Sequence, residues 1–294
     1  MRKAVIDLGT NTFNLLIAEV SEYSFEMIHS EKEGVALGMG GINEGFITQD
    51  AIERGLKALT HFKEVSESYH VQEIRGIGTS ALRDAANSSD FLQQVDEILG
   101  IHIEIISGEK EAELIYKGVK WSYDFREPGV IMDIGGGSTE FIFADSKGVN
   151  DLISLNIGVS RIYQHFNFHD PLSEDDIANI ENWLDIKSNG FFDDKQHDLL
   201  IGASGSFETF YELVHSIPFL EKINFVEIPF SELMQNLVDI IASTQMERDK
   251  NQWIVPIRKK MVPIAAVKTR WIIRKLGIKK VIISPCSLKE GAFL

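Results

Sequence analysis

The sequence predicts an α/β protein of two similar halves with a ligand site between them. An apolar segment near the N-terminus leads into Asp7-Leu8-Gly9, and a later one leads into Asp133-Ile134-Gly135. The two aspartates lie 126 positions apart (133 minus 7), and small polar residues and another apolar segment follow each motif. A chain of 294 residues also exceeds one average domain. We therefore expect a duplicated half-molecule whose two polar loops face each other across an interdomain site.

The composition is that of an ordinary globular protein and excludes several classes of function. Hydrophobic residues make up 44% of the chain and charged residues 25%, and the longest apolar runs are too short to span a bilayer. The N-terminus begins with a strand pattern, not a signal peptide, and the single cysteine, Cys286, excludes an internal disulfide. These features predict a cytoplasmic protein that does not act at a membrane.

Charge is unevenly distributed along the chain. The formal net charge of -15 argues against a broad nucleic-acid surface. Residues 247–294 nevertheless contain 12 Lys and Arg against 3 acids, a net charge of +9. This basic segment either draws a polyanionic ligand to one place or forms solvated helix faces that balance acidic neighbours. The sequence favours neither interpretation.

The residues after Asp133 form the most informative motif. Gly135–Gly137 lack a Cβ, so their backbone N–H groups can approach an anion closely. Asp133 and Glu140 could hold a hard cation such as Mg²⁺, which prefers carboxylate and phosphate oxygens. The alternative is a β-hairpin with a glycine-rich turn, because residues 139–144 alternate polar and apolar side chains. The second copy at Asp7 favours the phosphate loop.

In the first half, a helix and a strand precede a small-residue segment. Apolar residues recur at helical spacing over Gln49–Tyr69, and Glu73–Gly78 is typical of a short strand. The following segment contains Arg83, whose guanidinium offers a fork of donors suited to phosphate. The alternative is that Arg83 only pairs with Asp84 or with a helix carboxylate.

A second strand and helix follow. Residues 101–106 alternate as a strand and lead into a helix with Ser107 as its expected N-cap. Glu109, Glu111 and Glu113 lie in the first turns of this helix, where acids complement the helix dipole. The functional alternative is that one of them points into the site as a base. Their spacing does not choose among the three.

The second half repeats the plan of the first. The pattern is interrupted at Trp121–Pro128, so we expect domains at 1–125 and 126–294. Helices are expected at 158–166 and at Ser173–Asn189, where the first residues resemble a capping signal. The polar residues that come next are expected in a solvated loop and not in a metal site: Asp193, Asp194, His197 and Asp198.

A third small-residue turn, Gly202–Ser206, lies between the strand 199–201 and a helix over Phe207–His215. A turn of this kind at a helix N-terminus can receive a phosphate or a nucleotide. Two late helices are expected over Phe230–Ser243 and Ile257–Leu276, and a last strand over 280–283.

Five motifs together resemble the exopolyphosphatase/guanosine pentaphosphate phosphohydrolase (Ppx/GppA phosphatase) family over essentially the whole chain. They are Asp7–Thr12, Gly78–Asn87, Ile106–Ala112, Asp133–Glu140 and Gly202–Ser206. The resemblance implies two ribonuclease H-like domains of the fold shared by actin, sugar kinases and chaperone ATPases, with the site in the interdomain cleft. It also implies polyphosphate or a phosphorylated guanosine nucleotide as the partner, and a homodimer as a form the family often takes.

The resemblance implies roles for individual residues. Glu111 matches the catalytic base, and Glu140 is associated with the attacking water. Asp7, Asp133 and Glu140 match metal-associated positions, with Mg²⁺ as the expected cofactor and Mn²⁺ as an alternative. Phosphate contacts are implied for Gly9, Thr10, Asn11, Thr12, Arg83, Gly135, Gly136, Gly137, Ser138, Ser204, Gly205 and Ser206.

The sequence departs from the family at two places. The motif Leu-Arg-Glu-Gly is Leu288-Lys289-Glu290-Gly291 here, which puts bidentate phosphate binding at Lys289 in question. Lys110 separates Glu109 from Glu111, where the family often has adjacent acids. We also expect the chain to lack the C-terminal helical domains with which long members hold extended polyphosphate.

The function expected from this resemblance is that of an exopolyphosphatase, which releases terminal phosphate by metal-assisted, in-line attack of water. The alternatives are a guanosine pentaphosphate phosphohydrolase, a kinase or ATPase on the same fold, and a non-catalytic alarmone or nucleotide sensor.

Overall fold

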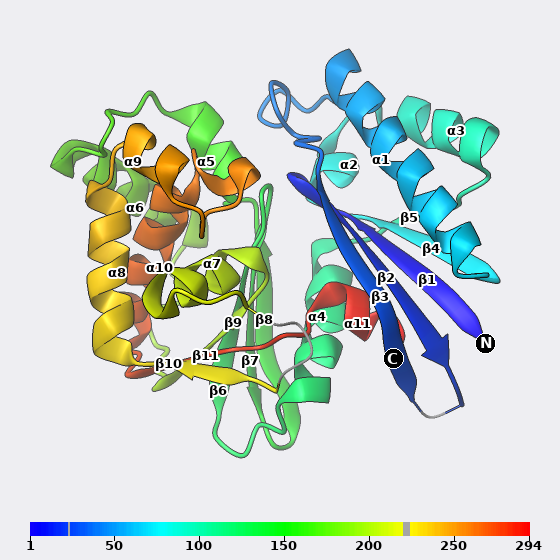
Figure 1. Ribbon diagram of the computed structural model, residues 1–294. Helices are drawn as coiled ribbons and strands as arrows, with labels where there is room; N and C mark the ends of the chain where they lie inside the picture. Colours follow the sequence, from blue (N-terminus) through cyan, green and yellow to red (C-terminus); the bar gives the residue numbers. More distant parts are fainter. Residues whose placement is uncertain (23, 220–223) are drawn as a thin grey trace.

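The protein consists of two mixed β-sheets with helices around and between them (Figure 1). The computed structural model describes residues 1–22, 24–219 and 224–294. The first sheet has the order β3-β2-β1-β4-β5 and contains β1 (Arg2–Leu8), β2 (Thr12–Val20), β3 (Phe25–Gly34), β4 (Glu73–Gly78) and β5 (Ile103–Ile105). The second has the order β10-β11-β9-β6-β7-β8 and contains β6 (Gly129–Ile134), β7 (Thr139–Asp145), β8 (Gly148–Leu155), β9 (Leu199–Ala203), β10 (Val226–Ile228) and β11 (Lys280–Ile283).

The two sheets have the same topology, which confirms the predicted duplication. In the first sheet β1, β2 and β3 pair antiparallel, and β4 and β5 continue parallel to β1. In the second, β6, β7 and β8 pair antiparallel, and β9 and β11 continue parallel to β6. Strand β10 adds an antiparallel edge. Each half therefore presents an Asp near the end of its first strand and a polar turn leading into its second.

Helices cover the outer face of each sheet. On the first sheet these are α1 (Gln49–Ser68), α2 (Ser80–Asp84) and α3 (Ser88–Leu99). On the second they are α5 (Val159–His165), α6 (Glu174–Ser188), α7 (Gly205–His215), α8 (Phe230–Ala242) and α10 (Val262–Leu276). Helix α9 (Gln245–Lys250) and the 3-10 turn Pro256–Arg258 lie between α8 and α10 in the chain. No helix in the described part of the chain is both long and apolar enough to cross a membrane.

Helix bounds agree with the sequence pattern except near Pro263. The helix expected over Ile257–Leu276 is a 3-10 turn followed by α10 from Val262. Proline favours the first turn of a helix because it has no N–H to donate to an earlier carbonyl. The capping signal at Ser173 is confirmed, since its side chain and that of Asp176 form a reciprocal capping box. The pattern did not predict α2, α3, α9 or the short helix α11 (Leu288–Gly291).

Two helices lie between the sheets (Figure 1): α4 (Gly108–Ser122) and the short α11 (Leu288–Gly291). Helix α4 shares a core with Val5 and Ile77 of the first sheet and with Ile131 and Ile142 of the second. Helix α11 packs on α4 and on β1 and β2, so the end of the chain returns to the first half. The domain boundary at residue 125 remains a prediction.

Close approach of α4 and α11 depends on glycine. A Cβ on Gly118 would lie 1.9 Å from the carbonyl oxygen of Ser287, and one on Gly291 would lie 1.8 Å from that of Leu114. Both distances are far inside van der Waals contact, so the two helix backbones touch only because neither position has a side chain.

We expect Gly118→Ala to destabilise the protein by about 1–3 kcal/mol through overpacking. In an isolated helix the same change would stabilise the helix by about 1 kcal/mol. The sign of the change in the free energy of unfolding therefore tests the packing of α4 against α11. Denaturant unfolding measures the free energy, with Lys117→Ala at the exposed neighbouring position as the control. Unchanged or increased stability of Gly118→Ala would contradict this packing.

Candidate active site

A cavity of about 180 Å³ lies between the two halves and is lined by residues of both. Every sequence-predicted site residue except Arg83 lines it. They are Asp7, Gly9, Thr10, Asn11, Thr12, Glu111, Asp133, Gly135, Gly136, Gly137, Ser138, Glu140, Ser204, Gly205 and Ser206. The fold therefore brings these residues together, while their individual roles remain predictions.

The two polar loops meet directly. A Cβ on Gly136 would lie 2.8 Å from Cγ of Asn11, and a Cβ on Gly137 would lie 2.4 Å from Oγ of Ser80. Ser160 on α5 donates a 2.6 Å hydrogen bond to Oδ1 of Asn11. The glycines are thus required for the approach of one half of the molecule to the other, a constraint that the sequence pattern did not reveal.

The third turn places a helix N-terminus on the cavity. Ser204, with φ of 69°, reverses the chain so that α7 starts at Gly205. A Cβ on Gly205 would lie 1.5 Å from Nη2 of Arg258, so glycine is needed here for a guanidinium to approach. The unpaired N–H groups at the start of α7 and the cation of Arg258 favour an anion at this end of the cavity.

Four of the carboxyl groups that line the cavity, all of them sequence-predicted site residues, each accept a hydrogen bond from a neighbouring side chain. Asn14 donates to Asp7 at 2.9 Å, Arg83 to Glu111 at 2.9 Å, Ser287 to Asp133 at 2.7 Å and Ser154 to Glu140 at 2.7 Å. Three of these donors are neutral, so among these four hydrogen bonds only the one to Glu111 comes from a charged group.

Burial raises the pKa of all four acids. It raises the pKa of Asp7 to about 7, with the charge of Glu111 as the next cause. It raises the pKa of Glu111 to about 7 although Arg83 opposes the shift. Burial is also the first cause of the raised pKa values of Asp133 and Glu140. Mutual repulsion adds to burial, so all four acids are more readily protonated than free carboxyl groups, and Asp7 and Glu111 take up protons or a cation near neutral pH.

This donor set fits a hard divalent cation that keeps part of its own hydration. In the residues that the structure describes, the only three carboxylate or imidazole ligand atoms within 4.8 Å of one another belong to Glu31, Glu33 and His61. The cavity acids are more widely spaced, so a cation held by one or two of them would complete its shell with water and phosphate oxygens. Mg²⁺ commonly binds in this way.

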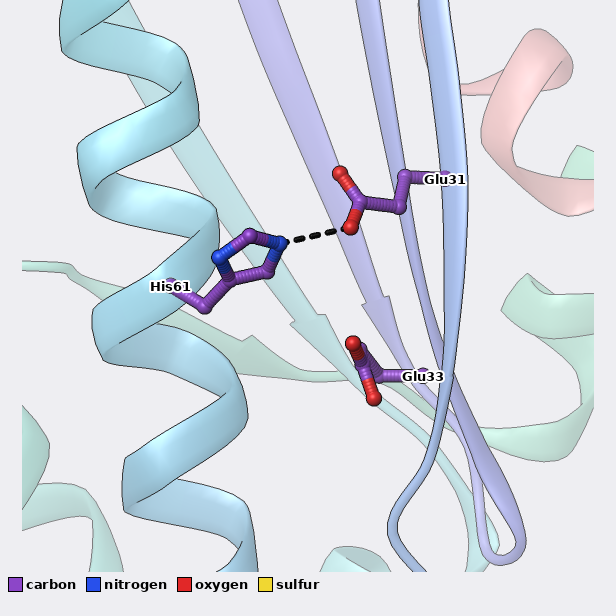
Figure 2. Close-up of side chains that lie close together, drawn as sticks. All are labelled: Glu31, Glu33 and His61. Carbon is purple, nitrogen blue, oxygen red and sulfur yellow. Dashed lines mark hydrogen bonds and ion pairs between the residues drawn. The ribbon is translucent and has the colours of Figure 1, made fainter.

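The cluster of Glu31, Glu33 and His61 lies on β3 and α1, outside the cavity lining (Figure 2). His61 pairs with Glu31 at 2.6 Å, and His29 pairs with the other oxygen of Glu31 at 3.2 Å. Ion pairing accounts for this arrangement, and it contains none of the expected metal ligands.

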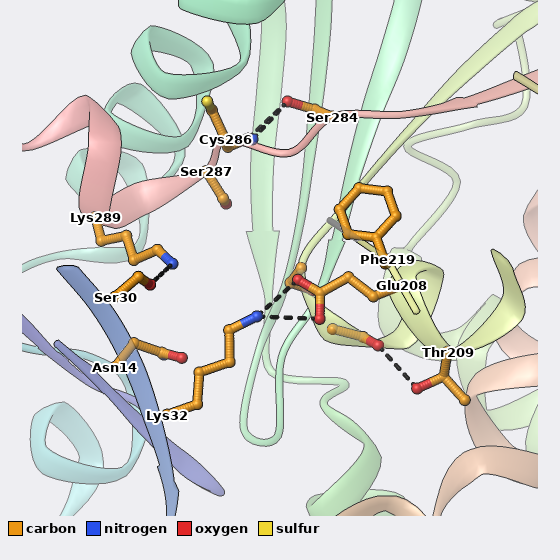
Figure 3. A network of polar contacts seen from close by, with 12 residues as sticks. Asn14, Ser30, Lys32, Glu208, Thr209, Phe219, Ser284, Cys286, Ser287 and Lys289 are labelled. Carbon is orange, nitrogen blue, oxygen red and sulfur yellow. Dashed lines mark hydrogen bonds and ion pairs between the residues drawn. The ribbon is translucent and has the colours of Figure 1, made fainter. Parts of the chain in front are cut away.

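Three basic side chains of the described residues line the cavity, and the sequence reasoning missed the first of them, Lys32. Figure 3 shows Lys32 on β3 reaching across to Glu208 on α7, with Nζ to Oε distances of 2.9 and 3.1 Å. Arg258 lies 3.6 Å from the same carboxylate. Lys289, in place of the family's arginine, donates to Ser30 at 3.0 Å. Lys32 had no sequence signal, because it is one exposed position of an alternating strand.

Some basic residues of the C-terminal segment line the cavity, where they can attract an anion, and others pair with acidic neighbours. Arg258 and Lys289 line the cavity, whereas Arg274 and Lys275 on α10 pair with acids of α6. Lys268 is fully buried beneath the central loop, where it donates to Thr139 and to the carbonyl of Ile157 at 2.5 Å. Burial lowers the pKa of Lys268 to about 7.

The sequence and the fold are similar to those of known proteins. The model of the Ppx/GppA phosphatase family matches residues 16–294. A crystal structure of an exopolyphosphatase from Cytophaga hutchinsonii is 32% identical, with a TM-score of 0.94 over 99% of this chain and 96% of that one. The Aquifex aeolicus PPX-GPPA enzyme is 25% identical, with a TM-score of 0.82 over 99% of this chain and 98% of that one.

A curated relative is longer. The bifunctional 3-dehydroquinate synthase/phosphatase of Fusobacterium nucleatum subsp. nucleatum is 32% identical over 307 residues, covering 99% of this chain and 46% of that protein. The chain thus spans about half the length of this relative. Because the family model covers almost all of the sequence and the duplicated fold and cavity agree with it, the chain belongs to the Ppx/GppA phosphatase family.

Proposed function

We propose that the protein is a metal-dependent phosphoanhydride hydrolase that releases terminal phosphate from inorganic polyphosphate. The observation that carries this proposal is the position of Glu111, which is buried on the cavity wall together with Asp7, Asp133 and Glu140. The similarity to an exopolyphosphatase over almost the whole chain supports polyphosphate as the substrate.

Glu111 is the base in this proposal. Among the acids of the first turns of α4 it is buried, whereas Glu109 and Glu113 are exposed. A carboxyl with a pKa of about 7 is half ionised near neutral pH and is still basic enough to take a proton from water. Arg83 orients the carboxylate by donating from Nη1 at 2.9 Å.

Backbone N–H groups and side-chain hydroxyls hold the phosphates. The loops after Asp7 and Asp133 and the N-terminus of α7 line the same cavity from three directions. Asp7, Asp133 and Glu140 would hold Mg²⁺, which would offset the phosphate charge. Positioning and charge stabilisation supply most of the rate in phosphoryl transfer, so the protein's main contribution is this fixed arrangement.

Substrate choice is tested by phosphate release from long polyphosphate, tripolyphosphate and guanosine pentaphosphate, each with Mg²⁺ or Mn²⁺. We expect the highest kcat/KM with polyphosphate. If phosphate is released only from guanosine pentaphosphate, this nucleotide and not polyphosphate is the substrate. Tight nucleotide binding with no release under any of these conditions would favour a sensor, and transfer from ATP to an acceptor would favour a kinase.

We expect Glu111→Gln to lower kcat at least about a hundredfold, because a general base contributes about 10²–10⁴ to the rate. Polyphosphate binding should persist, since the phosphate loops are unchanged. Glu113→Gln is the matched control, because it alters the same charge at an exposed position of α4 and should leave kcat unchanged. A near-normal kcat for Glu111→Gln would contradict the assignment of Glu111 as the base.

The raised pKa values also predict how metal-free stability depends on pH. Native Asp7 and Glu111 keep protons up to about pH 7, whereas the unfolded carboxyls release theirs at their ordinary values of 3.8 and 4.5. The native state therefore binds more protons in this window, and the free energy of unfolding falls as pH rises through it.

Thermal unfolding in a chelator should accordingly give a lower Tm at pH 8 than at pH 5, and added Mg²⁺ should raise Tm more at pH 8. Asp7→Asn should flatten the pH dependence, because it removes one of the titrating groups. A metal-free Tm that is constant or rises over this range would show that the acids are ionised without a cation.

A further inference from the structure

Arg161 on α5 makes several hydrogen bonds that join the two halves of the molecule. Its Nε donates to the carbonyl of Gly137 at 2.8 Å, within its own half of the molecule. Its two Nη atoms reach the other half, where they contact the carbonyl of Ile42 at 3.0 Å, Oγ of Ser80 at 3.4 Å and the carboxylate of Asp84. The side chain is 11% exposed, so these bonds are largely shielded from water.

Asp84 links this arginine to the candidate base. One oxygen of Asp84 accepts from Arg161, and the other lies 3.8 Å from Nε of Arg83. Nη1 of Arg83 then donates to Glu111 at 2.9 Å and to the carbonyl of Ile106 at 3.1 Å. The charges alternate along the series Arg161, Asp84, Arg83, Glu111, and only the first lies in the second half of the chain.

Arg83 has two carboxylates within reach and one guanidinium to share between them. Charge-assisted hydrogen bonds in a poorly solvated place are strong, so an unpaired Asp84 would compete with Glu111 for that guanidinium. Arg161 removes the competition by supplying a second cation on the far oxygen of Asp84.

We propose that Arg161 is a positioning residue for the hydrolysis: by pairing with Asp84 it leaves the guanidinium of Arg83 on Glu111. This inference rests on the proposed function, in which Glu111 is the base. Because Arg161 and Asp84 belong to different halves, the arrangement exists only while the halves are closed around the cavity.

Arg161→Ala is the first variant. We expect kcat with polyphosphate to fall about tenfold or more, since the base loses its orientation, with a smaller change in KM. Arg161→Lys keeps a charge beside Asp84 and should retain most of kcat. The matched control is Gln164→Ala on the same helix, which also removes hydrogen bonds between the two halves, to Gly38 and Gly40, but is not part of the charge series.

The double variant Arg161→Ala with Asp84→Asn separates positioning from simple attachment of the two halves. With the competing carboxylate neutralised, Arg83 should return to Glu111 and restore most of the lost kcat. If Arg161 only attached the halves to each other, the double variant would be at least as impaired as Arg161→Ala. Failure of this rescue, or an equal loss of kcat in Gln164→Ala, would overturn the inference.

A measurement that does not depend on catalysis tests the role of Arg161 separately from the proposed function. NMR of ¹⁵N-arginine side chains, with Arg83 assigned by the loss of its signals in Arg83→Lys, reports whether its guanidinium is held in place. We expect the signals to shift in Arg161→Ala and to return in the double variant. Unchanged Arg83 signals in Arg161→Ala would overturn the inference even in an active hydrolase. The expected shifts in a protein that releases no phosphate would instead refute only the proposed function.

Discussion

Burial of several carboxyl groups around one small cavity is the constraint on which the rest of the structure depends. Asp7, Glu111, Asp133 and Glu140 each have a hydrogen-bond donor, but only one of those donors is charged. Buried charge without compensation is unfavourable, so these acids hold protons or require a cation. That requirement makes the cavity suitable for a divalent metal and for the phosphate oxygens that share its coordination shell.

The duplicated fold is what assembles this cavity. Each half ends its first strand near an Asp and then turns through a polar loop, and the equivalent topology of the two sheets brings both turns to one place. Helix α4 packs between the sheets and carries Glu111 to the same cavity. Glycines at 118, 136 and 137 permit backbone approaches that any side chain would prevent. Packing and chemistry thus depend on the same few positions.

Much of the fold and the site could be predicted from local patterns. Helical spacing over Gln49–Tyr69 gave α1 to within one residue, and Ser107 caps α4 as expected by accepting from the N–H of Lys110. Arg83 shows the limit of local patterns. The sequence was compatible with two roles for this residue, pairing with a helix carboxylate and binding phosphate. The structure shows the first, with Glu111 as the partner, and phosphate binding by Arg83 remains a prediction.

The sequence by itself determined the repeat, the glycine-rich turns and the residue types at the site, because periodicity and the lack of a Cβ are properties of neighbouring positions. Spacing left Glu109, Glu111 and Glu113 open, and the resemblance to the family pointed to Glu111. Only the tertiary structure shows that Glu111 is the buried one of the three, since burial depends on how α4 packs. It also brought Lys32 to Glu208, and Arg161 to Asp84. The two pairs are separated by 176 and 77 residues in the sequence. A local sequence pattern cannot predict such contacts, because they exist only when the two halves pack against each other.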